Sequence, residues 1–227
     1  MVFVERKIQK VRNFVILVGK LLNNMKKQIF AIHGGDAFAT YEEYLANLRN
    51  WEIDIDRLHG KHDWKNNFPQ DLGDEYDVFL PEMPNKRNAK YVEWKIWFEK
   101  FVPFMEEGAI LVGHSLGGCF LAKYLAEETI PKRISATFLV AAPYDEAENP
   151  EFAKHLHDFA APKNLEKLAA QGGNIFLYQS KDDPVVSFTE LAKYQQALPG
   201  ATVRVLEDRG HIGQEHFPEI IEDIKSV

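Results

Sequence analysis

Short apolar runs alternate along the chain with longer segments in which apolar residues recur every three or four positions. The short runs predict buried strands, and the longer spacing predicts helices that bury one face. Six strands are expected, over residues 28–32, 76–80, 109–113, 134–142, 174–180 and 202–206, with helices over 40–50, 89–106 and 217–225 and directly after Gly118. Because strands and helices alternate, the pattern predicts a three-layer α/β fold, with helices on both faces of a mostly parallel sheet of about six strands.

Two segments depart from this alternation. Residues 51–74 are polar and rich in turn-forming residues, so we predict a solvated loop there. Residues 144–173 carry apolar side chains without a strand pattern, and we expect a helical excursion that forms a short lid beside the end of the preceding strand. His155 and His157 lie in this excursion, and we expect both on the surface.

The first 24 residues differ from the rest in charge. They carry five basic residues against one acidic residue, Glu5, whereas the remainder of the chain is acidic. Their apolar stretch, residues 14–18, is too short to cross a bilayer. The pattern favours an N-terminal extension over residues 1–24, outside the fold, rather than a basic amphipathic helix on a membrane surface. We therefore predict a single domain over residues 25–227 and no membrane contact.

Charge and cysteine usage narrow the function classes. The chain has a formal charge of −7, which argues against a nucleic-acid partner because nucleic-acid-binding proteins usually carry a basic face. Cys119 is the only cysteine, so the chain forms no internal disulfide, and a reducing, cytoplasmic compartment is expected. Its place in the predicted helix after Gly118 indicates a buried structural thiol rather than a nucleophile.

A serine stands between the third predicted strand and the helix that follows it. Residues 113–117 read Gly-His-Ser-Leu-Gly, with Ser115 at the centre. A serine on so tight a turn takes a strained backbone conformation, and the residues two before and two after it must be small because the arms of the turn nearly touch. The turn exposes the hydroxyl beside the N–H groups of a helix N-terminus, which stabilise an anion. We therefore predict that Ser115 is a nucleophile.

An acid and a histidine follow two later strands. Asp183 comes after the fifth predicted strand, where the proline that follows holds it in an extended conformation, and Asp182 is the neighbouring alternative. His211 lies in the loop after the last predicted strand. Because the carboxyl ends of parallel strands meet at one edge of a sheet, we expect Ser115, Asp183 and His211 to gather there.

Backbone N–H groups beside Ser115 complete the predicted site. The first strand ends in a His-Gly-Gly-Asp sequence, a loop that leaves N–H groups free at the end of the sheet. We predict that the N–H of Leu116 and that of Gly35, with Asp36 as the alternative, bind the oxyanion that forms when a carbonyl is attacked. An ordinary strand-to-helix turn, with His33 in a packing role, is the simpler interpretation of the same loop.

Four sequence stretches resemble one family of enzymes. GHSLGG around Ser115, SKDDPVV around Asp183, EDRGHI around His211 and YDVFLPEMPN at the second predicted strand resemble the small serine hydrolases of the retinoblastoma-binding-protein-nine type, members of the α/β-hydrolase superfamily. The resemblance extends over about residues 26–227. It implies an α/β-hydrolase-like fold, no metal and no organic cofactor, with Ser115, Asp183 and His211 as the catalytic triad. Residues 51–74 are long for such a compact fold.

These features predict a serine hydrolase that cleaves carboxylic esters, with thioesters and amides as chemical alternatives, by way of an acyl-enzyme. We expect a small-molecule acyl substrate. The alternative is a protein-binding module that keeps the fold but makes little use of the pocket, and a protein partner or a homodimer stays open. A metal site on His59, His62, Asp63 and His211 is disfavoured, since imidazoles three residues apart share a metal only on a helix and we predict a loop there.

Overall fold

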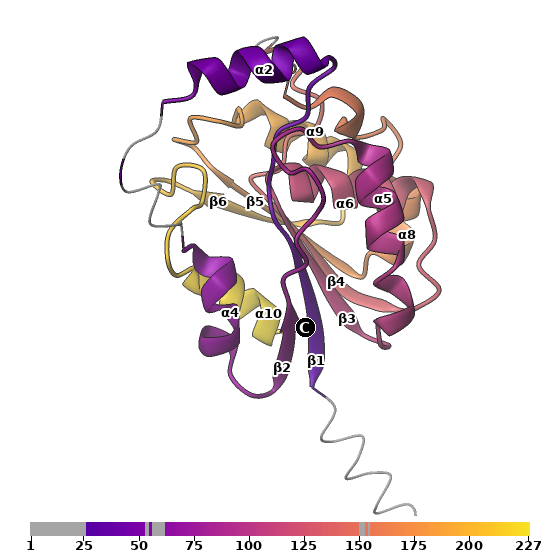
Figure 1. Cartoon of the computed structure of the whole chain (residues 1–227). Coiled ribbons are helices and arrows are strands. Elements are labelled where there is room, and N and C mark those ends of the chain that lie inside the picture. The colour runs from indigo at the N-terminus through magenta and orange to yellow at the C-terminus, as the bar shows by residue number, and fades with distance from the viewer. Residues whose placement is uncertain (1–25, 53–54, 56–61, 150–152, 154) are drawn as a thin grey trace, which may run out of the picture.

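The computed structural model describes residues 26–52, 55, 62–149, 153 and 155–227. A parallel six-stranded sheet runs through the middle of the molecule (Figure 1). The predicted extension over residues 1–24 and His59 lie outside the described residues. The strands are β1 Lys27–Ile32, β2 Tyr76–Phe79, β3 Ala109–His114, β4 Ile134–Val140, β5 Asn174–Ser180 and β6 Thr202–Leu206. Their order is β2-β1-β3-β4-β5-β6, and every neighbouring pair is parallel. The strands lie where the apolar runs predict them.

Helices cover both faces of this sheet (Figure 1). One face carries α4 Trp64–Leu72 and α10 Pro218–Lys225, and the other carries α5 Tyr91–Glu99, α6 Leu116–Glu127, α8 Glu166–Gln171 and α9 Thr189–Ala197. Helix α2 Tyr41–Asn50 lies beyond the carboxyl ends of the strands and has no buried residue. The arrangement is the predicted three-layer α/β fold. Among the described helices, none has the length and apolar character needed to cross a membrane.

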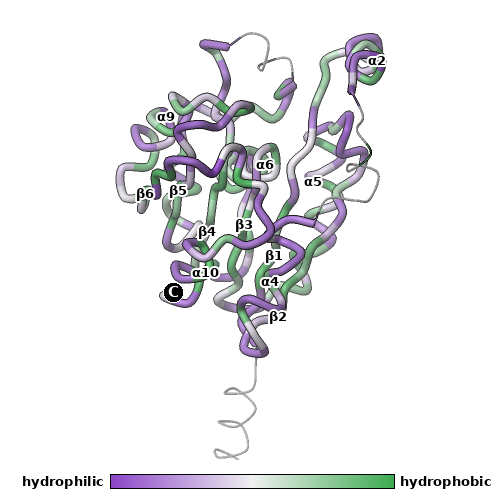
Figure 2. The backbone as a smooth tube through the Cα atoms, turned by 90° about the vertical axis from the view of Figure 1, so that its left-hand side faces the viewer, coloured by the Kyte–Doolittle hydropathy of each residue, from purple (hydrophilic) through white to green (hydrophobic). Residues whose placement is uncertain are grey.

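The side chains of the central strands alternate between two hydrophobic cores. Ile110 and Val112 of β3 belong to the core under α4 and α10, whereas Leu111 belongs to the core under α6. All three are fully buried, because β3 lies inside the sheet and has helices on both sides. Figure 2 shows this as mostly green strands in the middle of the molecule and mostly purple turns at its periphery. Burial on both faces explains why β3 reads as a continuous apolar run rather than an alternating one.

The largest departure from the predicted elements is helix α4. The sequence predicts a solvated loop over residues 51–74, but residues 64–72 form a helix whose first turn is capped by Asp63. Three large apolar side chains spaced four residues apart are buried against the sheet: Trp64, Phe68 and Leu72. Polar residues and a proline between them hide this stripe, so the loop prediction is wrong for this part of the segment.

The segment after β4, where a helical excursion with a short lid is predicted, packs against the core where the structure describes it. It contains a 3₁₀ helix, His157–Phe159, and the short helix α8. Four of its apolar side chains are buried in the core under α6: Leu156, Phe159, Leu165 and Leu168. These four side chains therefore anchor the segment to the core under α6. The predicted helix over residues 89–106 is also divided, because α5 ends at Glu99 and a 3₁₀ helix, Val102–Phe104, follows around Pro103.

Candidate active site

Ser115 lies at the sharp turn between β3 and α6. Its backbone has φ 56° and ψ −125°, a conformation that residues other than glycine rarely adopt. A Cβ atom on Gly113 would lie 2.5 Å from the carbonyl oxygen of Gly117, and one on Gly117 would lie 2.4 Å from the carbonyl oxygen of Ile32. Both positions therefore need glycine, as the spacing predicts, and the tight turn holds Ser115 in its strained conformation.

His211 and Asp183 form a hydrogen-bonded pair beyond the ends of β5 and β6. His211 Nδ1 lies 2.9 Å from Asp183 Oδ2 and 3.1 Å from Oδ1. The Asp183 carboxyl has no exposed surface; Oδ1 accepts the N–H groups of Val185 and Val186, and Oδ2 accepts the amide of Gln179. Because a carboxylate can only accept, Nδ1 of His211 carries a proton, and Nε2 is the acceptor in the neutral ring.

Asp182, the alternative acid, bonds to a different part of the same loop. Its Oδ1 accepts the hydroxyl of Ser180 at 2.6 Å and the N–H of Gly210 at 2.9 Å. It therefore braces the backbone before His211 and makes no bond to the imidazole. Of the two acids, the structure pairs His211 with Asp183, the one that the sequence favours.

The loop after β1 lies directly against the serine turn. A Cβ atom on Gly34 would lie 3.0 Å from Cβ of Ser115. His33 fixes this loop, since its Nδ1 donates to the carbonyl of Gly34 at 2.7 Å and its Nε2 accepts the N–H of Met83 at 2.8 Å. Burial lowers the pKa of His33, which keeps the ring neutral and both bonds in place. His33 is therefore a positioning residue for the loop.

The same loop separates the two candidate N–H donors. The N–H of Asp36 donates to the carbonyl of Lys86 at 2.9 Å, so it is already bonded. A Cβ atom on Gly35 would lie 2.4 Å from that carbonyl oxygen and 3.5 Å from Cδ2 of Leu116, so only glycine fits there without a shift of the backbone. Because the N–H of Asp36 is already bonded, Gly35 rather than Asp36 is the candidate that accompanies Leu116.

A cavity of about 370 Å³, here called the serine cavity, opens over Ser115. Gly35, Leu116 and His211 lie in its wall together with the serine. Several apolar side chains form much of the remaining wall: Trp51, Pro143, Leu156, Val185 and Val186. The structure thus brings the predicted side chains together, since Ser115 and His211 share one cavity and Asp183 is bonded to His211 from behind.

Four further polar residues line the serine cavity: Asp36, His114, Glu146 and His155. His114 directly precedes Ser115 in the predicted turn, so the turn motif itself contains this residue. His155 is half-buried, with Nδ1 3.6 Å from Oδ1 of Asp36, which corrects its predicted place on the surface. His157, by contrast, is exposed, as predicted.

His114 connects the serine turn to the loop that carries His211. Its Nε2 donates to the carbonyl of His211 at 2.9 Å, and its Nδ1 accepts from the ammonium group of Lys65 at 3.3 Å. Lys65 is buried in α4 and also pairs with Asp63 at 2.6 Å. A carbonyl and an ammonium group therefore fix one neutral tautomer of His114, with its proton on Nε2.

Helix α4 holds the loop that carries His211. The indole Nε1 of Trp64 donates to the carbonyl of Ile212 at 2.7 Å, and the Trp64 N–H donates to the carbonyl of Gln214 at 2.8 Å. The amide of Asn67 donates to the carbonyl of Glu215 at 2.9 Å. These bonds fix the residues directly after His211. Helix α4, which the sequence does not predict, therefore positions His211.

Replacing Trp64 by phenylalanine is expected to lower the free energy of unfolding by about 1–3 kcal/mol and to lower kcat several-fold. A phenyl ring would keep part of the aromatic packing and leave a small cavity, and the buried carbonyl of Ile212 would lose its donor. Urea unfolding and ester kinetics would measure both effects. Trp97→Phe is the matched control, because its indole bonds the Glu82 carbonyl at 3.1 Å but is largely exposed, where water replaces the donor. Equal losses in both variants would contradict the role of the buried bond.

Cys119 and Asp63 have structural partners in the described part of the chain. Burial raises the pKa of the Cys119 thiol, which donates to the carbonyl of Phe159 at 2.9 Å. Asp63 caps α4 and pairs with Lys65. Across the described residues, no group of three or more histidine, cysteine, aspartate or glutamate side chains is arranged to hold a metal ion.

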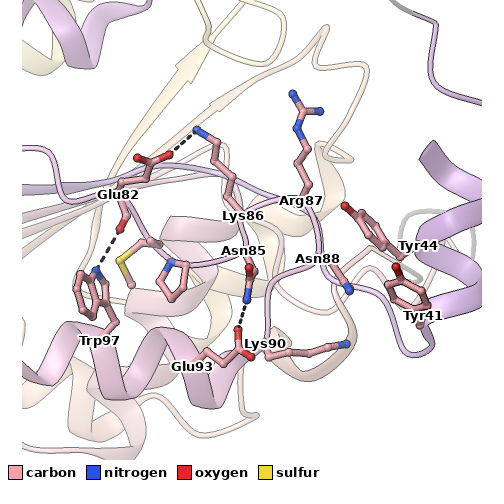
Figure 3. Close-up of a pocket in the computed structure, with 12 residues that line it drawn as sticks. Tyr41, Tyr44, Glu82, Asn85, Lys86, Arg87, Asn88, Lys90, Glu93 and Trp97 are labelled. Atoms are coloured by element: carbon pink, nitrogen blue, oxygen red, sulfur yellow. Dashed lines mark hydrogen bonds and ion pairs between the residues drawn. The ribbon is translucent and has the colours of Figure 1, made fainter. Parts of the chain in front are cut away.

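A larger cavity of about 810 Å³ lies between α2, the loop before α5 and α5 itself, and none of the predicted site residues lines it (Figure 3). Several of its polar groups bond to one another or to the backbone. Lys86 pairs with Glu82, the amide of Asn85 donates to Glu93 at 2.9 Å, and Lys90 donates to a backbone carbonyl. This cavity holds neither the strained serine nor the histidine–carboxylate pair, so the serine cavity is the candidate site.

Comparisons with solved structures show the fold family. The ydeN gene product of B. subtilis is similar, with a TM-score of 0.68 and 20% identity over 88% of this chain and 98% of that one. The 2-hydroxy-6-oxo-6-phenylhexa-2,4-dienoate hydrolase of Rhodococcus sp. strain RHA1 has a TM-score of 0.56 and 14% identity, over 88% and 89% of the two chains. The Arabidopsis methylesterase MES16 has a TM-score of 0.52 and 14% identity, over 88% and 100%.

Sequence comparison identifies the family itself. No curated protein matches this sequence. The model of the family described as "Serine hydrolase" matches residues 56–223, which is well over half of the chain and includes Ser115, Asp183 and His211. The parallel sheet and the solved structures agree with this match. The chain is therefore a hydrolytic enzyme with an α/β-hydrolase-like fold and belongs to the serine hydrolase family.

Proposed function

We propose that this hydrolase cleaves carboxylic esters of small molecules through an acyl-enzyme on Ser115. One observation carries the proposal: His211 is bonded through Nδ1 to the buried carboxylate of Asp183 at 2.9 Å and shares a cavity with Ser115, which a strained turn presents. That arrangement supplies a nucleophile, an orienting carboxylate, and a base whose Nε2 can accept a proton because Asp183 bonds only to Nδ1.

The chemistry follows from the protonation states. His211 Nε2 takes the hydroxyl proton of Ser115 as the oxygen attacks the ester carbonyl, and Asp183 stabilises the resulting imidazolium through Nδ1. The N–H groups of Leu116 and Gly35 bind the oxyanion. His211 then gives its proton to the leaving alcohol, and an acyl group remains on Ser115. Water attacks this acyl-enzyme by the same route in reverse and releases the acid.

The size of the serine cavity supports small acyl groups. A volume of about 370 Å³ lies at the lower end of the range typical of ligand pockets. Esters are the first choice, and thioesters fit the same chemistry, since the thioesterase domain of the curacin biosynthetic pathway shares this fold with a TM-score of 0.54 at 11% identity. Comparing ester and thioester of the same acid would separate the two.

The test is labelling with a fluorophosphonate, which phosphonylates an activated serine and releases fluoride. We expect one adduct, located at Ser115 by mass spectrometry, that disappears in Ser115→Ala and forms far more slowly in His211→Ala. Ser226→Ala, which removes an exposed serine near the C-terminus, should label like the unaltered protein. Folded protein that takes no label, or takes it on another serine, would overturn the proposal and favour a binding role for the cavity.

A further inference from the structure

Glu146 is the feature of the serine cavity that hydrolysis of a simple ester does not use. It lies in the loop after β4, lines the cavity, and has only 2% of its surface exposed. The backbone N–H of Ser187 faces this carboxyl, but no side chain of the described residues bonds to either oxygen. A buried carboxyl with so few donors is costly, so its position beside a ligand cavity calls for a ligand that completes its bonding.

The backbone around Glu146 is built to hold it there. The buried Oε2 of Glu190 accepts three successive N–H groups, those of Tyr144 at 2.7 Å, Asp145 at 2.9 Å and Glu146 at 2.9 Å. Glu146 itself has φ 50°, a left-handed conformation that a residue with a long side chain rarely takes. Three bonds to one carboxylate maintain this strain, which is typical of residues placed for function.

The charges around the serine cavity favour a cation. Two carboxyl groups, those of Asp36 and Glu146, line it together with three imidazoles, and the described lining residues include no lysine or arginine. The nearby ammonium group of Lys193 pairs with Glu190 and Asp145 at 2.5 Å each. No cation in the described wall of the cavity therefore competes with an incoming ammonium group for Glu146.

We propose that Glu146 is a specificity-determining residue, and that the preferred substrates of this hydrolase are esters that carry a primary ammonium group which pairs with its carboxylate. The proposal rests on the proposed function. A primary ammonium group offers three donors, enough to engage both carboxyl oxygens, and it brings the positive charge that this cavity lacks. The amine can lie in the acyl part or in the alcohol part of the ester, and the two are separated by experiment.

The test compares esters of equal length that end in an ammonium or a methyl group. On the acyl side these are p-nitrophenyl 6-aminohexanoate and p-nitrophenyl heptanoate, and on the alcohol side 4-aminobutyl benzoate and pentyl benzoate. We expect kcat/KM to favour the ammonium ester on one side by about tenfold or more. In Glu146→Leu and Glu146→Gln that preference should disappear, while the ester that ends in a methyl group is cleaved at least as well as before.

Glu148→Gln is the matched control, because it makes the same chemical change on an exposed carboxyl two residues along. It should keep the full preference. Two outcomes would overturn the role of Glu146 alone, provided that the esters ending in a methyl group are cleaved through Ser115. One is no preference for the ammonium ester on either side, and the other is a preference that survives in Glu146→Leu. A folded protein that cleaves none of the four esters and takes no fluorophosphonate label would overturn the proposed function, and this inference with it.

Discussion

Replacing Asp183 by asparagine is expected to lower kcat for a small ester by about 10⁴-fold while the protein remains folded. The reason lies in the bonds around this carboxyl. Oδ1 accepts the N–H groups of Val185 and Val186, so the amide oxygen of asparagine would take that place. The NH₂ group would then face His211 Nδ1, which lies 2.9 Å from Oδ2. A donor there forces the proton of His211 onto Nε2, and Nε2 could no longer accept the proton of Ser115.

Kinetics on p-nitrophenyl acetate with circular dichroism and urea unfolding would measure this effect. Asp182→Asn is the matched control, since asparagine retains an oxygen for the N–H of Gly210 and Asp182 makes no bond to the imidazole. We expect Asp182→Asn to change kcat by less than about tenfold. Comparable losses in the two variants would mean that both acids act through the loop backbone rather than through the tautomer of His211.

The positions of Ser115, Asp183 and His211 could be predicted because each depends on local pattern. Ser115 and Asp183 follow β3 and β5, which are buried on both faces, whereas His211 follows the more exposed edge strand β6. Parallel strands bring all three carboxyl ends to one edge. The glycines around Ser115 also leave a local signature, since Gly113 and Gly117 lie within contact of neighbouring backbone. Sequence patterns of this kind report the geometry of a single turn.

Other parts of the site depend on contacts between distant residues, and these leave no local pattern. Helix α4 has a polar sequence apart from three spaced side chains, and its importance comes from Trp64 reaching the carbonyl of Ile212. The choice between Gly35 and Asp36 turns on a hydrogen bond to Lys86. Glu146 looks like any acid in a loop, because the carboxylate of Glu190 that shapes its backbone lies 44 residues away. Such features become visible only in the folded chain.

Glu146→Gln is expected to stabilise the protein at pH 8 far more than at pH 5. Burial, followed by the neighbouring Glu190 carboxylate, raises the pKa of Glu146 from its ordinary 4.5 to about 7. The backbone N–H of Ser187 and then Lys193 oppose this rise, and Asp145 adds to it. The folded state therefore binds an extra proton between these values, so stability falls as the pH rises through that window and stays low above it. Because glutamine carries no charge, the gain should be about 2–3 kcal/mol larger at pH 8 than at pH 5.

Urea unfolding at the two pH values would measure this difference, and any constant effect of the amide cancels in it. Glu148→Gln, on an exposed carboxyl, should give the same small change at both values. A pH-independent effect of Glu146→Gln would mean that the carboxyl is ionised in the folded protein at pH 5 and has a partner there. The expected result has a functional side as well. If the glutamine variant is more stable above pH 7 and loses its preference for ammonium esters, the destabilising carboxyl is a cost to the fold that substrate binding requires.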